Sequence, residues 1–283
     1  MKSVYTTYMG IAFRLYPFCL GGKEIHMLFN EYGKEDAPAL LLLHGMMQDW
    51  HSEYVLLGAL ESDFRLIIPA QDGFYDGSGD FTSFADQARQ IEEYIAVNHG
   101  GRVCGAYGAS QGGLMLTELL TRNNIVIDTA IMDGCYVAHQ GKTAGKITYK
   151  MFLKFKNTGK FPPLILLMMK LMGLKEEDLG MMDSLYTGCS DETLKRNFLE
   201  NYTYRVRPEI SRCKTKVCLW CGSKEKYALR SHKELKQYLK NYEEEIMPGY
   251  GHGEFLMKHT DECRKKIRDT IRAGISDRVR REN

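Results

Sequence analysis

The chain lacks an excess of charge of either sign. Its 283 residues include 38 lysines and arginines against 36 aspartates and glutamates, so the formal net charge is only +2. A protein that binds nucleic acid must neutralise several phosphates and therefore usually carries a strongly basic face or tail. The balance of charge gives no reason to expect a nucleic-acid partner.

Long apolar runs are also missing. The richest segment, 161–174, is interrupted by Lys170 and is shorter than the about 20 apolar residues that a membrane-spanning helix needs. Near the N-terminus, the segment 11–20 contains Arg14 and Pro17, which a secretory signal would not. We therefore expect a cytoplasmic protein with no stable membrane insertion.

Patterns that bind metals or cofactors are absent too. The eight cysteines are scattered, as expected for small buried side chains in a reducing compartment. Cys218 and Cys221 are spaced like a metal-binding pair, but they fall in an expected strand, where residues three apart point to opposite faces. The loop 72–80 holds aspartates among glycines without the ligand spacing of an EF-hand. We predict no metal and no cofactor.

What the chain does contain is a regular alternation of strand-like and helix-like segments. Continuous apolar runs and amphipathic stretches predict strands over 40–43, 64–69, 103–107, 126–132, 217–221 and 245–248, and helices over 54–61, 82–98, 111–121, 231–241 and 260–273. Such alternation predicts an α/β protein with a mostly parallel sheet that helices cover on both faces.

The alternation breaks between residues 136 and 210, where Lys- and Met-rich helical stretches replace the strands. We therefore divide the chain into an N-terminal part of the core (1–135), a helical cap or lid (136–210) and a C-terminal part of the core (211–283). The methionine-rich segment 161–174 is predicted to pack the cap on the core, to line an adaptable apolar pocket, or both.

One strand-to-helix turn carries a serine at its apex. Ser110 is the centre of Gly108-Ala109-Ser110-Gln111-Gly112, between the strand-like 103–107 and the helix-like 111–121. A serine that must rise above a sheet on strained backbone angles needs very small neighbours, and the N-terminus of the next helix favours a developing oxyanion. A bare G-x-S-x-G motif is weak evidence, but a strand before it and a helix after it are typical of a nucleophile elbow.

Two further loops strengthen that interpretation. The apolar run 39–43 leads into His44-Gly45-Met46, and His252 lies between two glycines near the C-terminus. With a serine, an acid and a histidine in this order, the chain resembles the α/β-hydrolase superfamily, and its esterase and lysophospholipase-like branch in particular. The resemblance covers about residues 24–275. It implies the α/β-hydrolase fold, with a central, mostly parallel sheet flanked by helices and a helical cap insertion.

The resemblance also implies a catalytic triad. Ser110 would be the nucleophile and His252 its base. Glu225, in Gly222-Ser223-Lys224-Glu225, stands where many relatives carry an aspartate. Asp133 is the alternative acid, because some relatives take the acid from the end of the preceding strand.

The same resemblance assigns the oxyanion hole to two backbone groups, the N–H of Gln111 and the N–H of Met46. The chain lacks the HGGG sequence of some lipases and esterases. Because backbone groups survive side-chain substitution, this assignment is harder to test than the triad.

The expected function is that of a serine hydrolase that cleaves a small or lipid-like carboxylic ester through an acyl-enzyme on Ser110. A serine at the elbow argues against dehalogenase and epoxide-hydrolase chemistry, which would need an aspartate. Peptidase or amidase, thioesterase and acyltransferase activities share the acyl-enzyme and stay open, as does a ligand-binding protein without turnover. The expected partner is a small acyl substrate, and a homodimer is left open.

Overall fold

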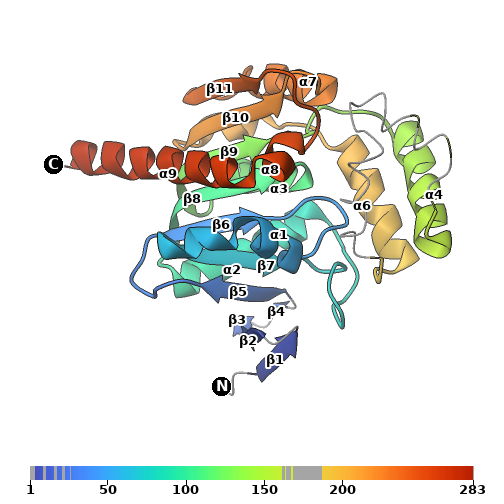
Figure 1. Cartoon of the computed structure of the whole chain (residues 1–283), viewed down its shortest axis with the longest axis horizontal. Helices are drawn as coiled ribbons and strands as arrows, with labels where there is room; N and C mark the ends of the chain where they lie inside the picture. The colour runs from blue at the N-terminus through green and yellow to red at the C-terminus, as the bar shows by residue number, and fades with distance from the viewer. Residues whose placement is uncertain are drawn as a thin grey trace.

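The computed structural model describes residues 4–8, 11–15, 18–20, 23–25, 27–160, 163, 167 and 187–282. Its centre is a seven-stranded sheet with the strand order β11-β10-β9-β8-β6-β7-β5 (Figure 1). The strands are β5 (Leu28–Tyr32), β6 (Ala39–Leu43), β7 (Arg65–Ala70), β8 (Arg102–Ala109), β9 (Val126–Asp133), β10 (Lys216–Gly222) and β11 (Tyr242–Met247). β5 is antiparallel to β7, and the other neighbouring strands are parallel.

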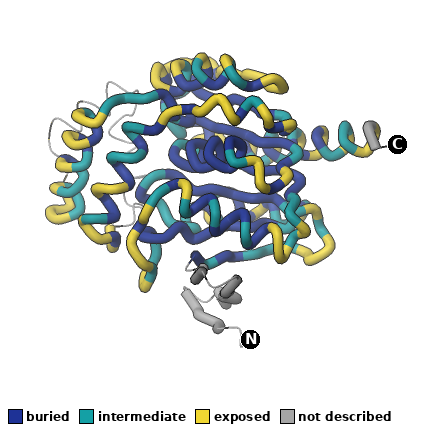
Figure 2. Tube along the Cα trace, turned by 180° about the vertical axis from the view of Figure 1, so that it is seen from behind, coloured by how far each residue is buried: buried dark blue, intermediate teal, exposed yellow. Residues whose placement is uncertain are grey.

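Helices cover both faces of this sheet. The α-helices are α1 (Trp50–Leu57), α2 (Phe84–Asn98), α3 (Gln111–Arg122), α4 (Lys142–Thr158), α6 (Asp191–Thr203), α7 (Lys226–Leu235), α8 (Glu254–Lys258) and α9 (Thr260–Glu282), and the short 3₁₀ helices are η1 (Gly58–Ser62) and η3 (Pro208–Arg212). Figure 2 shows that the inner strands of the sheet are largely buried, whereas the edge strand β11 and the outer sides of the helices are exposed. The predicted mostly parallel sheet flanked by helices is confirmed.

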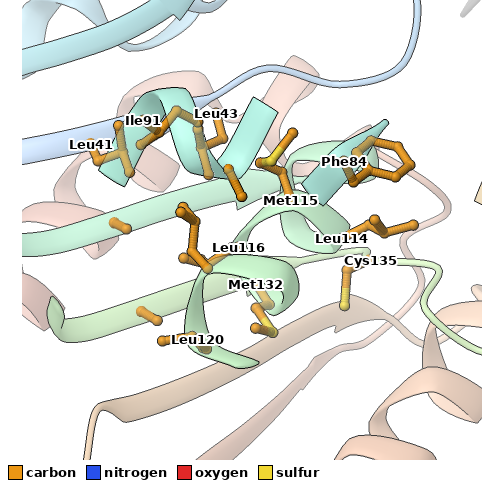
Figure 3. Packing of buried hydrophobic residues seen from close by; sticks show 14 of the residues in the cluster. Leu41, Leu43, Phe84, Ile91, Leu114, Met115, Leu116, Leu120, Met132 and Cys135 are labelled. Atoms are coloured by element: carbon orange, nitrogen blue, oxygen red, sulfur yellow. The ribbon is translucent and has the colours of Figure 1, made fainter. Parts of the chain in front are cut away.

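The two faces of the sheet bury two separate apolar clusters. Leu41 and Leu43 of β6 pack with α2 and α3 (Figure 3), while Leu40 and Leu42 pack with α1 and α9. Successive side chains of a strand point to opposite faces, so the uninterrupted leucine run supplies both clusters. This is the physical reason why a continuous apolar run, rather than an alternating one, marked this strand in the sequence.

Two helices begin and end several residues earlier in the chain than predicted. The helix expected over 54–61 begins at Trp50, because Asp49 caps its N-terminus and accepts a hydrogen bond from the Ser52 N–H. The helix expected over 231–241 is α7, which begins at Lys226 and ends at Leu235. Ser231 lies in the middle of this helix: its hydroxyl donates to the Tyr227 carbonyl one turn earlier at 3.0 Å and accepts from the N–H groups of a distant loop.

The segment between β9 and β10 contains α4 and α6. The two helices lie side by side at one end of the molecule (Figure 1), where the rings of Phe152 and Phe198 pack with their centroids 4.8 Å apart. The predicted methionine-rich segment 161–174 lies outside the described residues, apart from positions 163 and 167.

Two antiparallel strand pairs precede the sheet. They are β1 (Val4–Tyr8) with β2 (Ile11–Leu15), and β3 (Phe18–Leu20) with β4 (Lys23–Ile25). Within the described part of the chain, none of the helices combines the length and the apolar character required to cross a membrane.

Candidate active site

Ser110 lies in the tight turn between β8 and α3. Its backbone angles are φ 54° and ψ −114°, in a region that costs energy for any residue with a side chain and is held only by surrounding structure. Two hydrogen bonds hold it: the Ser110 N–H donates to the Asp133 carbonyl at 2.8 Å, and the Ser110 carbonyl accepts from the Gly113 N–H at 3.1 Å. The predicted elbow therefore has the strained geometry that the chemistry requires.

The glycines of the motif are required by close approach of backbone to backbone. A Cβ on Gly108 would lie 2.4 Å from the Gly112 carbonyl oxygen, and a Cβ on Gly112 would lie 2.0 Å from the carbonyl oxygen of Leu43. The first oxygen belongs to the first turn of α3 and the second to the end of β6, so neither can move away without disturbing its element. The two glycines thus allow β6, β8 and α3 to meet beneath the serine.

Ser110, His252 and Glu225 form one hydrogen-bonded chain. The Ser110 hydroxyl lies 3.0 Å from His252 Nε2, and His252 Nδ1 lies 2.7 Å from Glu225 Oε2. Since a carboxylate only accepts hydrogen bonds, Nδ1 carries the proton and Nε2 is free to accept the proton of the serine. The other carboxylate oxygen of Glu225 accepts from the Gly222 N–H at 2.7 Å.

The charges of this pair are mutually stabilised. Burial by itself would raise the pKa of Glu225, but the hydrogen bond and charge of His252, together with the Gly222 N–H, hold that pKa below its usual value. Burial would lower the pKa of His252, but the hydrogen bond and charge of Glu225 raise it above its usual value. The arrangement favours an ionised glutamate beside a histidine that readily takes up a proton.

Asp133, the alternative acid, faces a different partner. Its Oδ2 accepts a hydrogen bond from the Tyr107 hydroxyl at 2.8 Å. Burial, together with the nearby charge of Glu225, raises the pKa of Asp133 to about 6. Of the two carboxylates that the sequence left open, Glu225 is therefore the one hydrogen-bonded to His252.

Sequence reasoning missed two residues that follow β9 and touch the histidine. Gly134 has φ +57°, and a Cβ there would lie 2.8 Å from Glu225 Oε2 and 3.2 Å from His252 Nδ1. The ring of Tyr136 stacks on that of His252, with centroids 4.7 Å apart and planes inclined by 27°. The only sequence feature that could have assigned these two residues to the site was their position directly after a strand that ends beside the elbow.

The loop after β6 holds the first predicted oxyanion donor, Met46. The loop is closed by Gln48, whose side-chain oxygen accepts from the Gly45 N–H at 3.0 Å. His44 is fully buried, and burial lowers its pKa to about 4, so it is neutral and structural. Met46 and Gln111, the two residues predicted to supply the oxyanion hole, line one cavity together with Ser110.

That cavity has a volume of about 570 Å³. Its wall combines the serine and histidine loops with α4, α6 and α7. The lining residues are Gly45, Met46, Met47, Gln48, Leu56, Ala109, Ser110, Gln111, Asp133, Tyr136, Gln140, Ala144, Ile147, Thr148, Met151, Phe152, Phe198, Asn201, Tyr202, Tyr227, Arg230, His252, Gly253, Leu256 and Met257. A mostly apolar wall with a few polar groups is typical of a small-molecule site.

Comparison with known proteins gives the fold. A scan against protein-family models finds no match, and a search of curated proteins finds none either. Among solved structures, an α/β-hydrolase family protein from Desulfitobacterium hafniense is similar with a TM-score of 0.74 and 21% identity, over 85% of this chain and 98% of that one. This chain has the α/β-hydrolase fold.

Other structures with the α/β-hydrolase fold differ in chemistry. A structure from a study of carboxylesterases of Nitrososphaera gargenis has a TM-score of 0.70 at 15% identity, over 97% of this chain and all of that one. The 2-hydroxy-6-oxo-6-phenylhexa-2,4-dienoate hydrolase of Rhodococcus has a TM-score of 0.66 at 16% identity, over 87% of this chain and 94% of that one. Fold alone therefore leaves the substrate open, and the site must decide it.

In this α/β-hydrolase fold the candidate site lies at the carboxyl ends of the parallel strands. Ser110 follows β8, Asp133 ends β9, and Glu225 follows β10. Ligands of open α/β sheets bind outside this edge. Three neighbouring strands thus bring together residues that lie far apart in the sequence.

Proposed function

We propose that the protein is a serine hydrolase that cleaves a small or lipid-like carboxylic ester through an acyl-enzyme on Ser110. The observation that carries the proposal is the hydrogen-bonded chain from the Ser110 hydroxyl through His252 to Glu225. Its serine and histidine open into a cavity of about 570 Å³. A nucleophile, a base and an orienting acid in this order are the parts that acyl transfer needs.

In the first half of the reaction, the Ser110 oxygen attacks the carbonyl carbon of the ester while His252 Nε2 takes the hydroxyl proton. Glu225 stabilises the resulting imidazolium and keeps the ring in the right tautomer. The backbone N–H groups of Met46 and Gln111 bind the oxyanion, a contribution for which one donor is typically worth about 10²–10³ in rate. His252 then protonates the leaving alcohol, which leaves the acyl group on Ser110.

The second half repeats the chemistry with water. His252 takes a proton from the water that attacks the acyl carbon, and returns that proton to the Ser110 oxygen when the acid departs. In this proposal the segment 136–210 acts as a cap, because its helices α4 and α6 line the cavity. The mostly apolar wall favours short-to-medium acyl chains over charged peptides.

The first test is covalent labelling. A fluorophosphonate probe should add one label, seen by intact mass, to the wild type and to Ser211→Ala, whose serine lies outside the cavity. Ser110→Ala should take up none and should lose nearly all hydrolysis of p-nitrophenyl butyrate, apart from the residual rate that the oxyanion hole and binding alone support. Folded wild type that several probes fail to label, or a Ser110→Ala variant labelled like the wild type, would disprove the assignment.

A further panel separates the ester from its alternatives. p-Nitrophenyl esters of increasing chain length, the matching thioesters and the matching anilides should rank with the short-to-medium esters first. Faster cleavage of an anilide or an N-terminal peptide substrate would move the reaction class to amidase or peptidase. Tight binding of an ester without turnover would instead indicate a ligand-binding protein.

A further inference from the structure

Arg230 is the only lysine or arginine among the described residues that line the cavity. Most arginines in the described part of the chain have a carboxylate partner, as in Arg122 with Glu92 at 2.8 Å or Arg207 with Glu118 at 2.8 Å. Within the described part of the chain Arg230 has no such partner. Arg230 is an exposed residue that lines the cavity holding Ser110 and His252, so its side chain is available to a ligand.

The backbone of Arg230 is fixed relative to the site. The neighbouring Ser231 is fully buried, and its hydroxyl accepts from the N–H groups of Val137 and Ala138 at 3.0 and 3.1 Å. One turn earlier in α7, the ring of Tyr227 lies 6.0 Å from that of Tyr136, which stacks on His252. The cation thus belongs to a helix that is anchored beside the histidine.

Nothing else among the described lining residues neutralises this cation. The one carboxyl group in that wall is Asp133, which accepts the Tyr107 hydroxyl at 2.8 Å. Glu225 is held by His252 and the Gly222 N–H. The cavity therefore presents a positive charge without a free carboxylate to balance it.

One side chain of the wall also has a hydrogen-bond donor without an acceptor. Gln111 is 2% exposed and lines the cavity, and its side-chain oxygen accepts from Asn201 at 2.8 Å. Among the described residues the Nε2 group of Gln111 has no partner. A buried donor without an acceptor is costly, so an acceptor oxygen brought to this part of the wall would stabilise it.

We infer that the substrate carries an anionic group, a carboxylate or a phosphate, at a distance from the reacting ester, and that Arg230 binds this group. The planar guanidinium fork matches two oxygens of either anion. The inference rests on the proposed function, because it places the ester carbonyl at Ser110. The inference narrows the proposed substrate class from small or lipid-like carboxylic esters in general to esters that also carry an acidic group.

Four chromogenic esters test this inference. p-Nitrophenyl octanoate is neutral, mono-p-nitrophenyl suberate carries a carboxylate on the acyl chain, p-nitrophenyl 8-phosphonooxyoctanoate carries a phosphate there, and 4-octanoyloxy-3-nitrobenzoate carries a carboxylate on the leaving group. For each ester the ratio of kcat/KM between wild type and variant is measured, so that differences in intrinsic reactivity cancel. The position and type of the preferred anion show which source of negative charge the cavity accepts.

Arg230→Met should lower kcat/KM for at least one anionic ester roughly tenfold relative to the neutral ester, mainly through KM. Arg205→Met removes an exposed arginine outside the cavity and should leave all four ratios equal. If the wild-type activity depends on Ser110 but Arg230→Met lowers kcat/KM equally for all four esters, or for none of them, the inference is wrong and the proposed function stands. A wild type that cleaves no ester and takes up no probe would instead remove the proposed function itself.

Discussion

At the scale of single residues, one hydrogen bond distinguishes the two candidate carboxylates. Glu225 and Asp133 both follow or end a strand beside the elbow, and both influence the charge of His252. Only Glu225 bonds the imidazole, at 2.7 Å, while Asp133 bonds a tyrosine hydroxyl. The two residues should therefore respond differently to neutral substitution.

Glu225→Gln should lower kcat for p-nitrophenyl butyrate by about 10²–10⁴-fold, because an amide cannot balance the imidazolium charge and can enforce the wrong tautomer. Asp133→Asn should cost less than about tenfold, since an amide oxygen can still accept from Tyr107. Thermal melts of both variants serve as the control for folding. A nearly inactive Asp133→Asn beside a nearly wild-type Glu225→Gln would reassign the acid.

The same pair sets the pH profile. His252 must be neutral to accept the serine proton, and its pKa is raised above 6.5, so kcat/KM should rise with pH through a value above 6.5. Glu225→Gln removes the main cause of the raised pKa of His252, so the increase of kcat/KM with pH should move to lower pH. A rise that stays in place would mean that another group controls it.

At the scale of elements, the loop after β9 is shaped to let α7 and the histidine loop approach the serine. Gly134 is a point of close approach, because its missing side chain leaves the space for the contact between Glu225 and His252. The position of α7 depends on the same loop through Ser231. Both contacts join residues that lie far apart in the sequence, so local patterns could not reveal them. For this reason the start of α7 was predicted five residues too late.

Gly134→Ala tests this role against a matched control. Gly134 and Gly100 have nearly equal angles, φ +57° and +59°, but a Cβ at Gly100 would meet nothing within 4 Å. Both alanines should cost about 1–2 kcal/mol of stability from the positive φ, measured by urea unfolding. Only Gly134→Ala should also lower kcat, at least tenfold, by displacing the pair. Equal kcat in both variants would contradict the close approach.

At the scale of the whole molecule, a buried acid makes stability depend on pH. Glu53 of α1 is 1% exposed, and burial, with a smaller effect of the Asp133 charge, raises its pKa to about 8. Between the ordinary pKa of 4.5 and about 8, the unfolded chain loses a proton that the folded chain keeps. The free energy of unfolding must therefore fall as the pH rises through this window.

Glu53→Gln should flatten that fall. The wild type should lose about 3 kcal/mol through Glu53 between pH 5 and pH 8, as measured by urea unfolding at each pH, and the variant should lose correspondingly less. Glu35→Gln, at an exposed position, should keep the wild-type slope. Identical slopes in all three proteins would show that Glu53 titrates in the folded protein as it does in the unfolded chain.

The sequence by itself determined the features that local patterns encode. Apolar runs and helical spacing gave the alternating elements and the mostly parallel sheet. The small residues around Ser110 and His252 marked the two turns, because the close backbone approach at Gly108 and Gly112 and the positive φ of Gly253 both favour glycine. These signals lie within a few residues of one another, so they can be read along the chain.

Only the tertiary structure decided what depends on distant contacts. Ser110 and His252 are 142 residues apart. The hydrogen bond between Glu225 and His252, the close approach at Gly134 and the stacking of Tyr136 arise where neighbouring strands end together. Arg230, on α7, lacks a carboxylate partner among the described residues. Each depends on distances of a few ångströms between side chains from different elements. Such distances follow from how the sheet and helices pack, and no local pattern in the sequence specifies them.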